Sequence, residues 1–240
     1  MFKLGKNTEP HPFFSCVLVA AGASTRMGED KLMIDLGGLP LVVRTLRALD
    51  ACVCLDEIVI VTKSEKIPMF SDLIRAFSIE KVKHIVTGGE TRMESALQGV
   101  RLCSPEAELI GVHDGARPFA DPELISGVAR AASEHGAAAP AITCRDTVRL
   151  ARGGKVTKTL DRDSVYLMQT PQVFRADLLR RALESAVRLG LTLTDDVEAV
   201  MLEDAEAEVW LVEGSDQNIK LTTPVDIAVA RAILEERGEW

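Results

Sequence analysis

Three segments of the sequence carry charged side chains that handle phosphate groups in many proteins. The segment VLVAAGASTRMGEDK ends an apolar run in small residues and then presents Arg26 and Lys31. The segment HDGARP presents Asp114 and Arg117, and the segment EGSDQNIK ends at Lys220. A carboxylate can hold Mg²⁺, and guanidinium and ammonium groups neutralise phosphate oxygens. If the three segments meet, the chemistry they favour is phosphoryl or nucleotidyl transfer.

Two loops of small residues could bring backbone amides close to a nucleotide. Residues 20–23 follow the first apolar run, and Gly88 and Gly89 lie in the segment TGGETRMES, which leads into a helical pattern. Small residues let backbone N–H groups approach a base or a phosphate closely, although tight turns also use glycine for geometry alone. Neither loop matches GxGxxG or GxxxxGK[ST], which disfavours a Rossmann dinucleotide site and a P-loop.

The elements that must position these segments alternate between apolar runs and amphipathic stretches. The apolar runs predict strands at 15–20, 57–62, 83–86, 108–113, 137–142 and 208–214. The amphipathic stretches predict helices at 40–51, 122–134, 175–190, 194–205 and 224–236. This alternation predicts an α/β fold, in which a mostly parallel sheet has helices on both faces. Because ligands bind at the carboxyl ends of parallel strands, we expect the charged segments to meet at one edge of the sheet.

The alternation breaks between about residues 143 and 173. Two stretches of period two flank Gly153 and Gly154, which predicts a β-hairpin with exposed polar faces. Such a ribbon has little core of its own, so we expect it to project and to pack against a second copy of the chain. No repeat or linker divides the sequence. We therefore expect residues 1–240 to form a single domain with this arm inserted at about 143–173.

The bulk composition narrows the class of protein. With 28 basic and 36 acidic side chains the net charge is −8, which disfavours nonspecific binding to nucleic acid. No run approaches the ~18 apolar residues of a membrane span, and the N-terminal residues lack a signal-peptide pattern. The five cysteines show neither paired CxxC units nor a His cluster, which disfavours a zinc site or a disulfide framework. We expect a soluble cytoplasmic protein.

Seven segments, taken together and in order, resemble the 2-C-methyl-D-erythritol 4-phosphate cytidylyltransferase family from about Cys16 to Ala232. They are VAAGASTRMG, GGETRMESA, HDGARPF, DTV, LDRDSVYLMQTPQVF, TDD and VEGSDQNIKLTTPVD. The resemblance implies a three-layer, Rossmann-like nucleotidyltransferase domain with a projecting β-arm that forms a homodimer. It implies transfer of CMP from CTP to 2-C-methyl-D-erythritol 4-phosphate with release of pyrophosphate, a step of non-mevalonate isoprenoid precursor synthesis, and Mg²⁺ as the cofactor.

The resemblance also implies roles for individual residues. The catalytic residues would be Arg26, Lys31, Arg162 and Lys220, and the metal would be held by Asp114. The nucleotide site would be formed by Ala20, Ala21, Gly22, Ala23, Gly88, Gly89, Glu90, Arg92, Ser95, Gly115 and Ala116. The phosphate and polyol of the acceptor would contact Arg117, Thr147, Arg162, Thr170, Thr194 and Lys220. Of these, Thr147 and Arg162 would lie on the arm and reach the site of a neighbouring subunit.

Two features of the sequence leave alternatives open. The stretch MGEDKL before and after Lys31 is short for the family and is similar to molybdopterin cytidylyl- and guanylyltransferases, and Glu90 stands where Asp is frequent. A cytidylyltransferase acting on ribitol 5-phosphate or molybdopterin is one alternative. A nucleotide-binding regulatory module without chemistry is another. If the protein is a cytidylyltransferase, the acceptor phosphate is already ionised at neutral pH. Catalysis then depends on charge neutralisation and positioning rather than on a strong general base.

Overall fold

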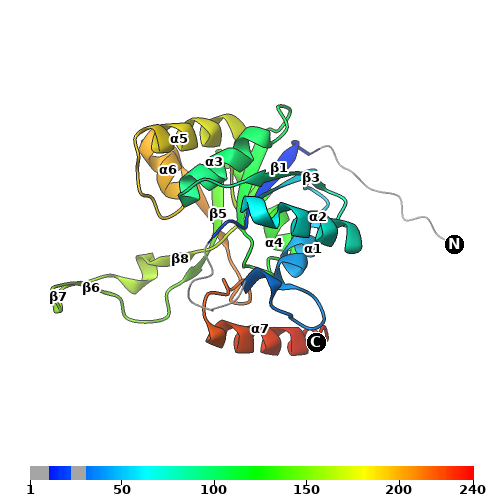
Figure 1. Cartoon of the computed structure of the whole chain (residues 1–240). Helices are drawn as coiled ribbons and strands as arrows, with labels where there is room; N and C mark the ends of the chain where they lie inside the picture. Colours follow the sequence, from blue (N-terminus) through cyan, green and yellow to red (C-terminus); the bar gives the residue numbers. More distant parts are fainter. Residues whose placement is uncertain (1–10, 23–30) are drawn as a thin grey trace.

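The structure, a computed structural model, describes residues 11–22 and 31–240 and is built around one central sheet (Figure 1). Its strands are β1 (Phe14–Val19), β2 (Glu57–Thr62), β3 (Val82–Thr87), β4 (Leu109–Asp114), β5 (Ala137–Thr143), β8 (Tyr166–Met168), β9 (Gln172–Arg175) and β10 (Val209–Glu213). The strand order is β10-β5-β9-β4-β1-β2-β3, and β8 pairs with β5.

Most of the sheet is parallel, as the sequence predicts. The strand β1 pairs in parallel with β2 and β4, β2 pairs with β3, and β10 pairs with β5. The exceptions are β9, which lies antiparallel between β4 and β5, and β8, which runs antiparallel to β5. The carboxyl ends of the parallel strands therefore meet at one edge, where the charged segments follow them.

Helices cover both faces of the sheet (Figure 1). One face carries α3 (Arg92–Leu102), α5 (Ala176–Arg188) and α6 (Asp196–Glu203), and the other carries α1 (Leu41–Ala51), α2 (Ile67–Ala76) and α4 (Pro122–His135). The last helix, α7 (Pro224–Glu236), packs its buried side chains into the α1 and α4 side of the core. The predicted three-layer architecture is confirmed, and α2 is an addition to it. Within residues 11–22 and 31–240, no helix is long and apolar enough to cross a membrane.

The core is divided by the sheet into two apolar clusters. Successive side chains of a strand point to opposite faces, so Cys16 and Leu18 of β1 lie in the cluster below α1 and α4, and Val17 lies in the cluster below α3. All three side chains are fully buried. This two-sided burial is why the first strand reads in the sequence as a continuous apolar run.

Two helices begin where the sequence predicts. The carboxylate of Asp121 accepts a hydrogen bond from Leu124 N at 2.8 Å, which caps α4 ahead of Pro122. Thr223 and Asp226 form a reciprocal capping box at the start of α7. The cap at Thr223 fixes α7 directly after the segment that carries Lys220.

The predicted hairpin is formed by β6 (Arg149–Arg152) and β7 (Lys155–Thr159), which project from the body (Figure 1). Gly153 and Gly154 have φ of +55° and +77°, the left-handed conformation that a two-residue hairpin turn of this type requires. All residues of both strands are exposed. At one end of the 143–173 segment Thr143 belongs to β5, and near the other end β8 and β9 pair with the central sheet, so the projecting part is shorter than that segment.

Candidate active site

Three charged side chains from two distant segments meet at the carboxyl edge of the sheet. Asp114 is the last residue of β4, and its Oδ2 atom lies 3.0 Å from Lys220 Nζ and 3.4 Å from Arg117 Nε. Asp114 is 9% exposed, whereas the Lys220 side chain is 41% exposed. We call these three residues the Asp114 cluster. The structure thus brings together the HDGARP and EGSDQNIK segments, as the strand-end rule predicts.

Backbone hydrogen bonds draw the surrounding loops to this cluster. Gly115 N donates to Val19 O at 3.0 Å, which ties the loop after β4 to the end of β1. Leu221 N donates to Ala116 O at 2.9 Å, and Lys31 Nζ donates to Leu221 O at 3.4 Å. Lys31, at the start of the short helix η1 (Lys31–Met33), therefore lies beside the Lys220 segment. Ala116 is buried and supports the site through its carbonyl group.

The electrostatics of the cluster keep Asp114 ionised. Burial alone raises the pKa of this carboxyl, but the Lys220 ammonium and the Arg117 guanidinium outweigh burial and lower the pKa to about 2. The neighbouring His113 is fully buried, and burial lowers its pKa to about 4. At neutral pH the edge therefore presents a carboxylate, two cations and a neutral imidazole.

Asp114 fits a magnesium site of one particular kind. Among the residues that the structure describes, no group of three or more His, Cys, Asp or Glu side chains is placed to hold a metal ion. Mg²⁺ is commonly held by one or two carboxylates together with substrate phosphates and water. A single ionised carboxylate beside cationic side chains matches that pattern, in which the triphosphate supplies the remaining oxygens.

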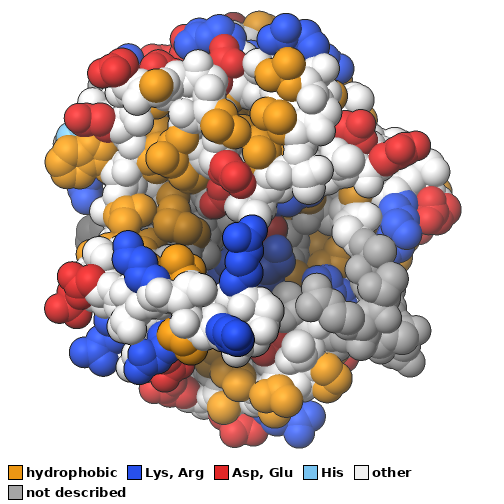
Figure 2. Space-filling view, turned by 90° about the vertical axis from the view of Figure 1, so that its left-hand side faces the viewer, with side chains coloured by type: hydrophobic (Ala, Val, Ile, Leu, Met, Phe, Trp, Pro, Cys, Tyr) orange, Lys and Arg blue, Asp and Glu red, His pale blue; other side chains and the backbone are white. Residues whose placement is uncertain are grey.

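A cavity of about 440 Å³ lies between the loops after β1, β2 and β3. Its lining includes Ala21, Gly22, Thr62, Gly88, Gly89, Glu90, Arg92 and Ser95. A Cβ atom on Gly88 would lie 2.7 Å from Ser95 Oγ and 2.8 Å from Ala21 Cβ, so the two loops can pack this closely only because residue 88 is glycine. Figure 2 shows a hollow in the middle of one face of the molecule, with Lys and Arg side chains around it.

The start of α3 fixes the rim of this cavity. Thr91 Oγ1 accepts from Glu94 N at 3.1 Å, and Glu94 Oε2 accepts from Thr91 N at 2.9 Å, which forms a capping box. Ser95 Oγ accepts from Gly89 N at 3.2 Å and holds the glycine loop against the helix. Glu90 is exposed between them. The positive end of a helix dipole thus faces the cavity, which favours an anionic or carbonyl-bearing ligand.

Arg92 and Thr194 have protein partners in the structure. Arg92 Nη2 donates to Asp196 Oδ2 at 2.6 Å, and Asp196 is completely buried. The backbone N–H and hydroxyl of Thr194 both donate to Glu198 Oε2, at 2.8 and 3.0 Å. Arg92 also lines the cavity, so it connects α3 to α6 at the wall of the site. Contacts of these two residues with nucleotide or acceptor stay predictions.

The predicted arm residues Thr147 and Arg162 flank the β6–β7 hairpin in the sequence. Thr147 is exposed, and Arg162 lies in the short helix η3 (Arg162–Ser164), where its Nη1 atom donates to Arg145 O at 3.4 Å. At the root of the arm, Thr170 is buried. Its Oγ1 atom accepts from Asp114 N at 3.1 Å and lies 2.9 Å from His113 Nδ1.

Ala20 is buried at the end of β1, where its N–H group donates to Val61 O at 2.7 Å. Two other predicted site residues, Ala23 and Arg26, lie outside the described residues. The roles of Ala23 and Arg26 in the site therefore remain predictions from the sequence.

The side-chain amides of Asn218 and Gln169 support the Asp114 cluster, and the sequence alone does not point to either residue. Asn218 Nδ2 donates to Thr170 O at 3.0 Å and to Gln169 Oε1 at 3.3 Å, and Arg117 Nη1 donates to Asn218 O at 2.7 Å. Both amide side chains are buried. Their spacing in the sequence gives no signal, because only the tertiary fold buries them.

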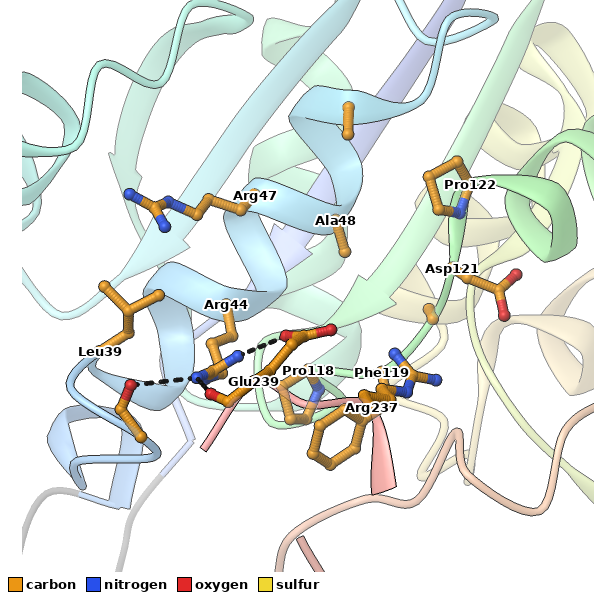
Figure 3. Close-up of a pocket in the computed structure, with 13 residues that line it drawn as sticks. Leu39, Arg44, Arg47, Ala48, Pro118, Phe119, Asp121, Pro122, Arg237 and Glu239 are labelled. Atoms are coloured by element: carbon orange, nitrogen blue, oxygen red, sulfur yellow. Dashed lines mark hydrogen bonds and ion pairs between the residues drawn. The ribbon is translucent and has the colours of Figure 1, made fainter. Parts of the chain in front are cut away.

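A second cavity, of about 480 Å³, lies between α1, the loop at 118–122 and the C-terminal residues (Figure 3). It contains cationic side chains, but Arg44 donates to Leu36 O at 2.6 Å, to Gly37 O at 3.2 Å and to the Glu239 carboxylate at 2.8 Å. Because the Arg44 guanidinium already donates its hydrogen bonds to these protein groups, this cavity is a weaker candidate for a triphosphate than the glycine-lined one.

A mostly parallel sheet with two small-residue loops and an ion-paired carboxylate at its carboxyl edge is the arrangement expected of an α/β nucleotidyltransferase. The family model of 2-C-methyl-D-erythritol 4-phosphate cytidylyltransferase matches residues 14–236. The chain belongs to this family.

Individual relatives agree with the family match. A 2-C-methyl-D-erythritol 4-phosphate cytidylyltransferase of Geobacillus kaustophilus is 39% identical over 226 residues, covering 93% of this chain and 98% of the relative. The crystal structure of 4-diphosphocytidyl-2C-methyl-D-erythritol synthase from Anaerococcus prevotii has a TM-score of 0.84 at 31% identity, covering 93% and 99% of the two chains. The corresponding cytidylyltransferase of Thermus thermophilus has a TM-score of 0.75 at 30% identity, covering 91% and 98%.

Proposed function

We propose that the protein transfers CMP from CTP to 2-C-methyl-D-erythritol 4-phosphate and releases pyrophosphate. Family membership supports the reaction, and one structural observation supports the site. The Asp114 cluster and Lys31 converge at the sheet edge that also carries the glycine-lined cavity. Backbone amides of the loops would hold the cytidine part of CTP in the cavity, and the triphosphate would extend toward the cluster.

The cations of this edge make the approach of two anions feasible. The acceptor phosphate is ionised at neutral pH and can attack the α-phosphorus without a strong base, so the barrier comes largely from charge repulsion and misalignment. Lys220, with its half-exposed ammonium, and Lys31 would neutralise phosphate oxygens, and Arg117 is held in place by Asn218 O and Asp114. Mg²⁺ held by Asp114 would add neutralising charge to the triphosphate.

We also propose a homodimer in which the arm of one subunit completes the site of the other. The hairpin has no core, and it exposes Leu150 and Val156 to 49% and 62%. A partner surface would bury these side chains and bring Thr147 and Arg162 to an acceptor phosphate. The five free cysteines fit our proposal of a cytoplasmic location.

The identity of the acceptor is tested by pyrophosphate release. Purified protein is given CTP and Mg²⁺ with 2-C-methyl-D-erythritol 4-phosphate, ribitol 5-phosphate or molybdopterin in parallel. We expect kcat/KM for the first acceptor to exceed the others by at least about 10²-fold, because a site built to hydrogen-bond one polyol leaves polar groups unpaired with another. Faster turnover with ribitol 5-phosphate or molybdopterin would replace the proposed acceptor. CTP binding with no pyrophosphate release for any of the three would favour a regulatory module.

A further inference from the structure

Two cysteines lie in direct contact at the end of the sheet opposite the active site. Cys52 is the C-cap residue of α1, and Cys54 follows in a tight turn that Leu55 N closes on Cys52 O at 3.2 Å. Their Sγ atoms are 3.3 Å apart. The strand β2 begins three residues later, so the pair lies at the amino ends of the parallel strands. We call this pair the Cys52–Cys54 dithiol.

The surroundings of the dithiol are polar for a buried position. Ser126 Oγ on α4 lies 3.5 Å from both sulfur atoms, and Pro122 O lies 3.8 Å from Cys52 Sγ. The hydrogen bond from Cys54 lowers the pKa of the Cys52 thiol to about 6 in spite of burial, and the same bond raises the pKa of Cys54. The thiolate is the reactive form of cysteine, and the hydrogen bond between the two sulfur atoms favours its formation within the pair.

A small reagent can reach one member of the pair. Cys52 is completely buried, but Cys54 is partly exposed and lines a cavity of about 200 Å³ together with His11, Ser126 and Arg130. Cys144 makes a useful comparison because it is also partly exposed, yet the contact described for its sulfur is with Asp146 O at 3.6 Å rather than with a thiol. Accessibility and a second thiol within contact distance coincide at the dithiol.

We propose that the Cys52–Cys54 dithiol is an oxidation site that hydroperoxides convert to an intramolecular disulfide. The dithiol loses one proton to solvent, and Cys54, whose sulfur a peroxide can reach, attacks an oxygen of hydrogen peroxide as a thiolate while Cys52 holds the proton that the two sulfur atoms share. The O–O bond breaks, the Cys54 sulfur becomes a sulfenic acid, and the leaving hydroxide takes the proton from Cys52, which gives one water and a Cys52 thiolate. This thiolate attacks the sulfenic sulfur and displaces hydroxide, which takes up a proton from solvent, so that two thiols and one hydrogen peroxide give a disulfide and two waters.

The geometry requires little movement for the second step. An S–S bond is about 2.05 Å long, so the two sulfur atoms must approach by about 1.3 Å from their present separation. Cys52 is part of the core, but Val53 is 71% exposed and Cys54 is partly exposed, so the movement can come mainly from Cys54. Ring closure within three residues competes well with further oxidation, since the resolving thiol is already in place.

The experiment treats the native full-length protein with hydrogen peroxide, stops the reaction with catalase, unfolds the chain and labels free thiols with a maleimide. We expect wild-type protein to fall from five labelled cysteines to three, with Cys52 and Cys54 in one cross-linked peptide. The unlabelled mass should fall by about 2 Da, the two hydrogens lost on disulfide formation, and dithiothreitol should restore all five thiols. Loss of Cys52 and Cys54 labelling should be at least about tenfold faster than loss of Cys144 labelling.

Matched variants separate this chemistry from general thiol oxidation. Cys144→Ser removes the partly exposed lone thiol and should leave the cross-link unchanged. Cys54→Ser, at the more exposed of the two positions, should abolish the cross-link and keep Cys52 labelled, while pyrophosphate release stays at the wild-type level and shows that the chain has folded. The proposal is overturned if Cys52 and Cys54 remain labelled after Cys144 has been oxidised. It is equally overturned if Cys54 gains oxygen atoms without a cross-link.

Discussion

Replacing Asp114 by Asn tests the electrostatics of the active site directly, because Asn has the same shape and lacks the charge. The pKa of Asp114 falls from 3.8 to about 2 in the folded protein, through Lys220 and Arg117 acting against burial. At about 1.4 kcal/mol per pKa unit, the ionised side chain contributes about 2.5 kcal/mol to the free energy of unfolding. Asp114 is 9% exposed, so solvent screens this contribution little.

The expected result for Asp114→Asn has a defined pH dependence. A carboxyl whose folded pKa is depressed stabilises the protein above its unfolded pKa, and this stability is lost as the pH falls through the folded value. The variant should therefore be less stable than wild type by about 2.5 kcal/mol above pH 5, and the difference should shrink between about pH 4 and 2. Urea unfolding in EDTA at several pH values measures it.

A surface carboxylate provides the control for this experiment. Asp72 contacts Arg75 at 3.2 Å, but both side chains are more than three quarters exposed. Asp72→Asn should change the free energy of unfolding by less than about 0.5 kcal/mol. If Asp114→Asn behaved like Asp72→Asn at pH 7, or if its deficit grew toward acid pH, the ion-paired cluster would not exist as described. The loss of pyrophosphate release in Asp114→Asn should be about 10²-fold or more.

Three further outcomes are expected. Lys31→Ala should lower kcat for CTP turnover by roughly 10²-fold, the scale of losing an electrostatic stabiliser, and near wild-type turnover would remove Lys31 from the catalytic role. Arg162→Ala should also lower activity. Mixing this variant with Lys31→Ala should recover about a quarter of wild-type activity, because half of the dimers are mixed and each mixed dimer has one intact site. Confirmed mixed dimers without recovery would contradict a crossed arm. Gly99→Ala should destabilise the fold by about 1–3 kcal/mol in urea unfolding, because the new Cβ lies 2.4 Å from Val17 Cγ1 and 2.6 Å from Val61 Cγ2; an unchanged unfolding midpoint would show that α3 packs less closely.

The sequence predicts β1, β2 and β4 well because these strands are buried on both faces of the sheet. The run at 57–62 is entirely apolar apart from its ends, and the structure places β2 at the same residues. By contrast, the sequence does not predict α2, because Phe70 is the only fully buried side chain of this helix and its other apolar residues are partly exposed. The sequence does not predict β9, which lies across the end of the predicted arm and the start of the predicted helix at 175–190, because its antiparallel position between β4 and β5 depends on pairing with residues far along the chain.

The sequence likewise predicts some features of the candidate site and not others. The strand-end rule suffices to bring Asp114 and Lys220 together, since it depends only on the parallel sheet. It cannot predict that Arg92 pairs with Asp196, because that contact depends on how α3 and α6 pack, 104 residues apart. Nor can it predict that Asn218 is buried. Local patterns predict which loops reach the site, whereas the side-chain partners depend on the tertiary fold.

In the proposed dimer, the root of the arm would connect the partner subunit to the Asp114 cluster. Thr170 lies between β8 and β9, and its hydroxyl is bonded to the backbone N–H of Asp114. A displacement of the hairpin by a neighbouring subunit would be transmitted along β8 to Thr170 and would shift the carboxylate against Lys220. If the dimer forms as proposed, separating its subunits would remove the partner's arm from the site and would also release the restraint on Asp114.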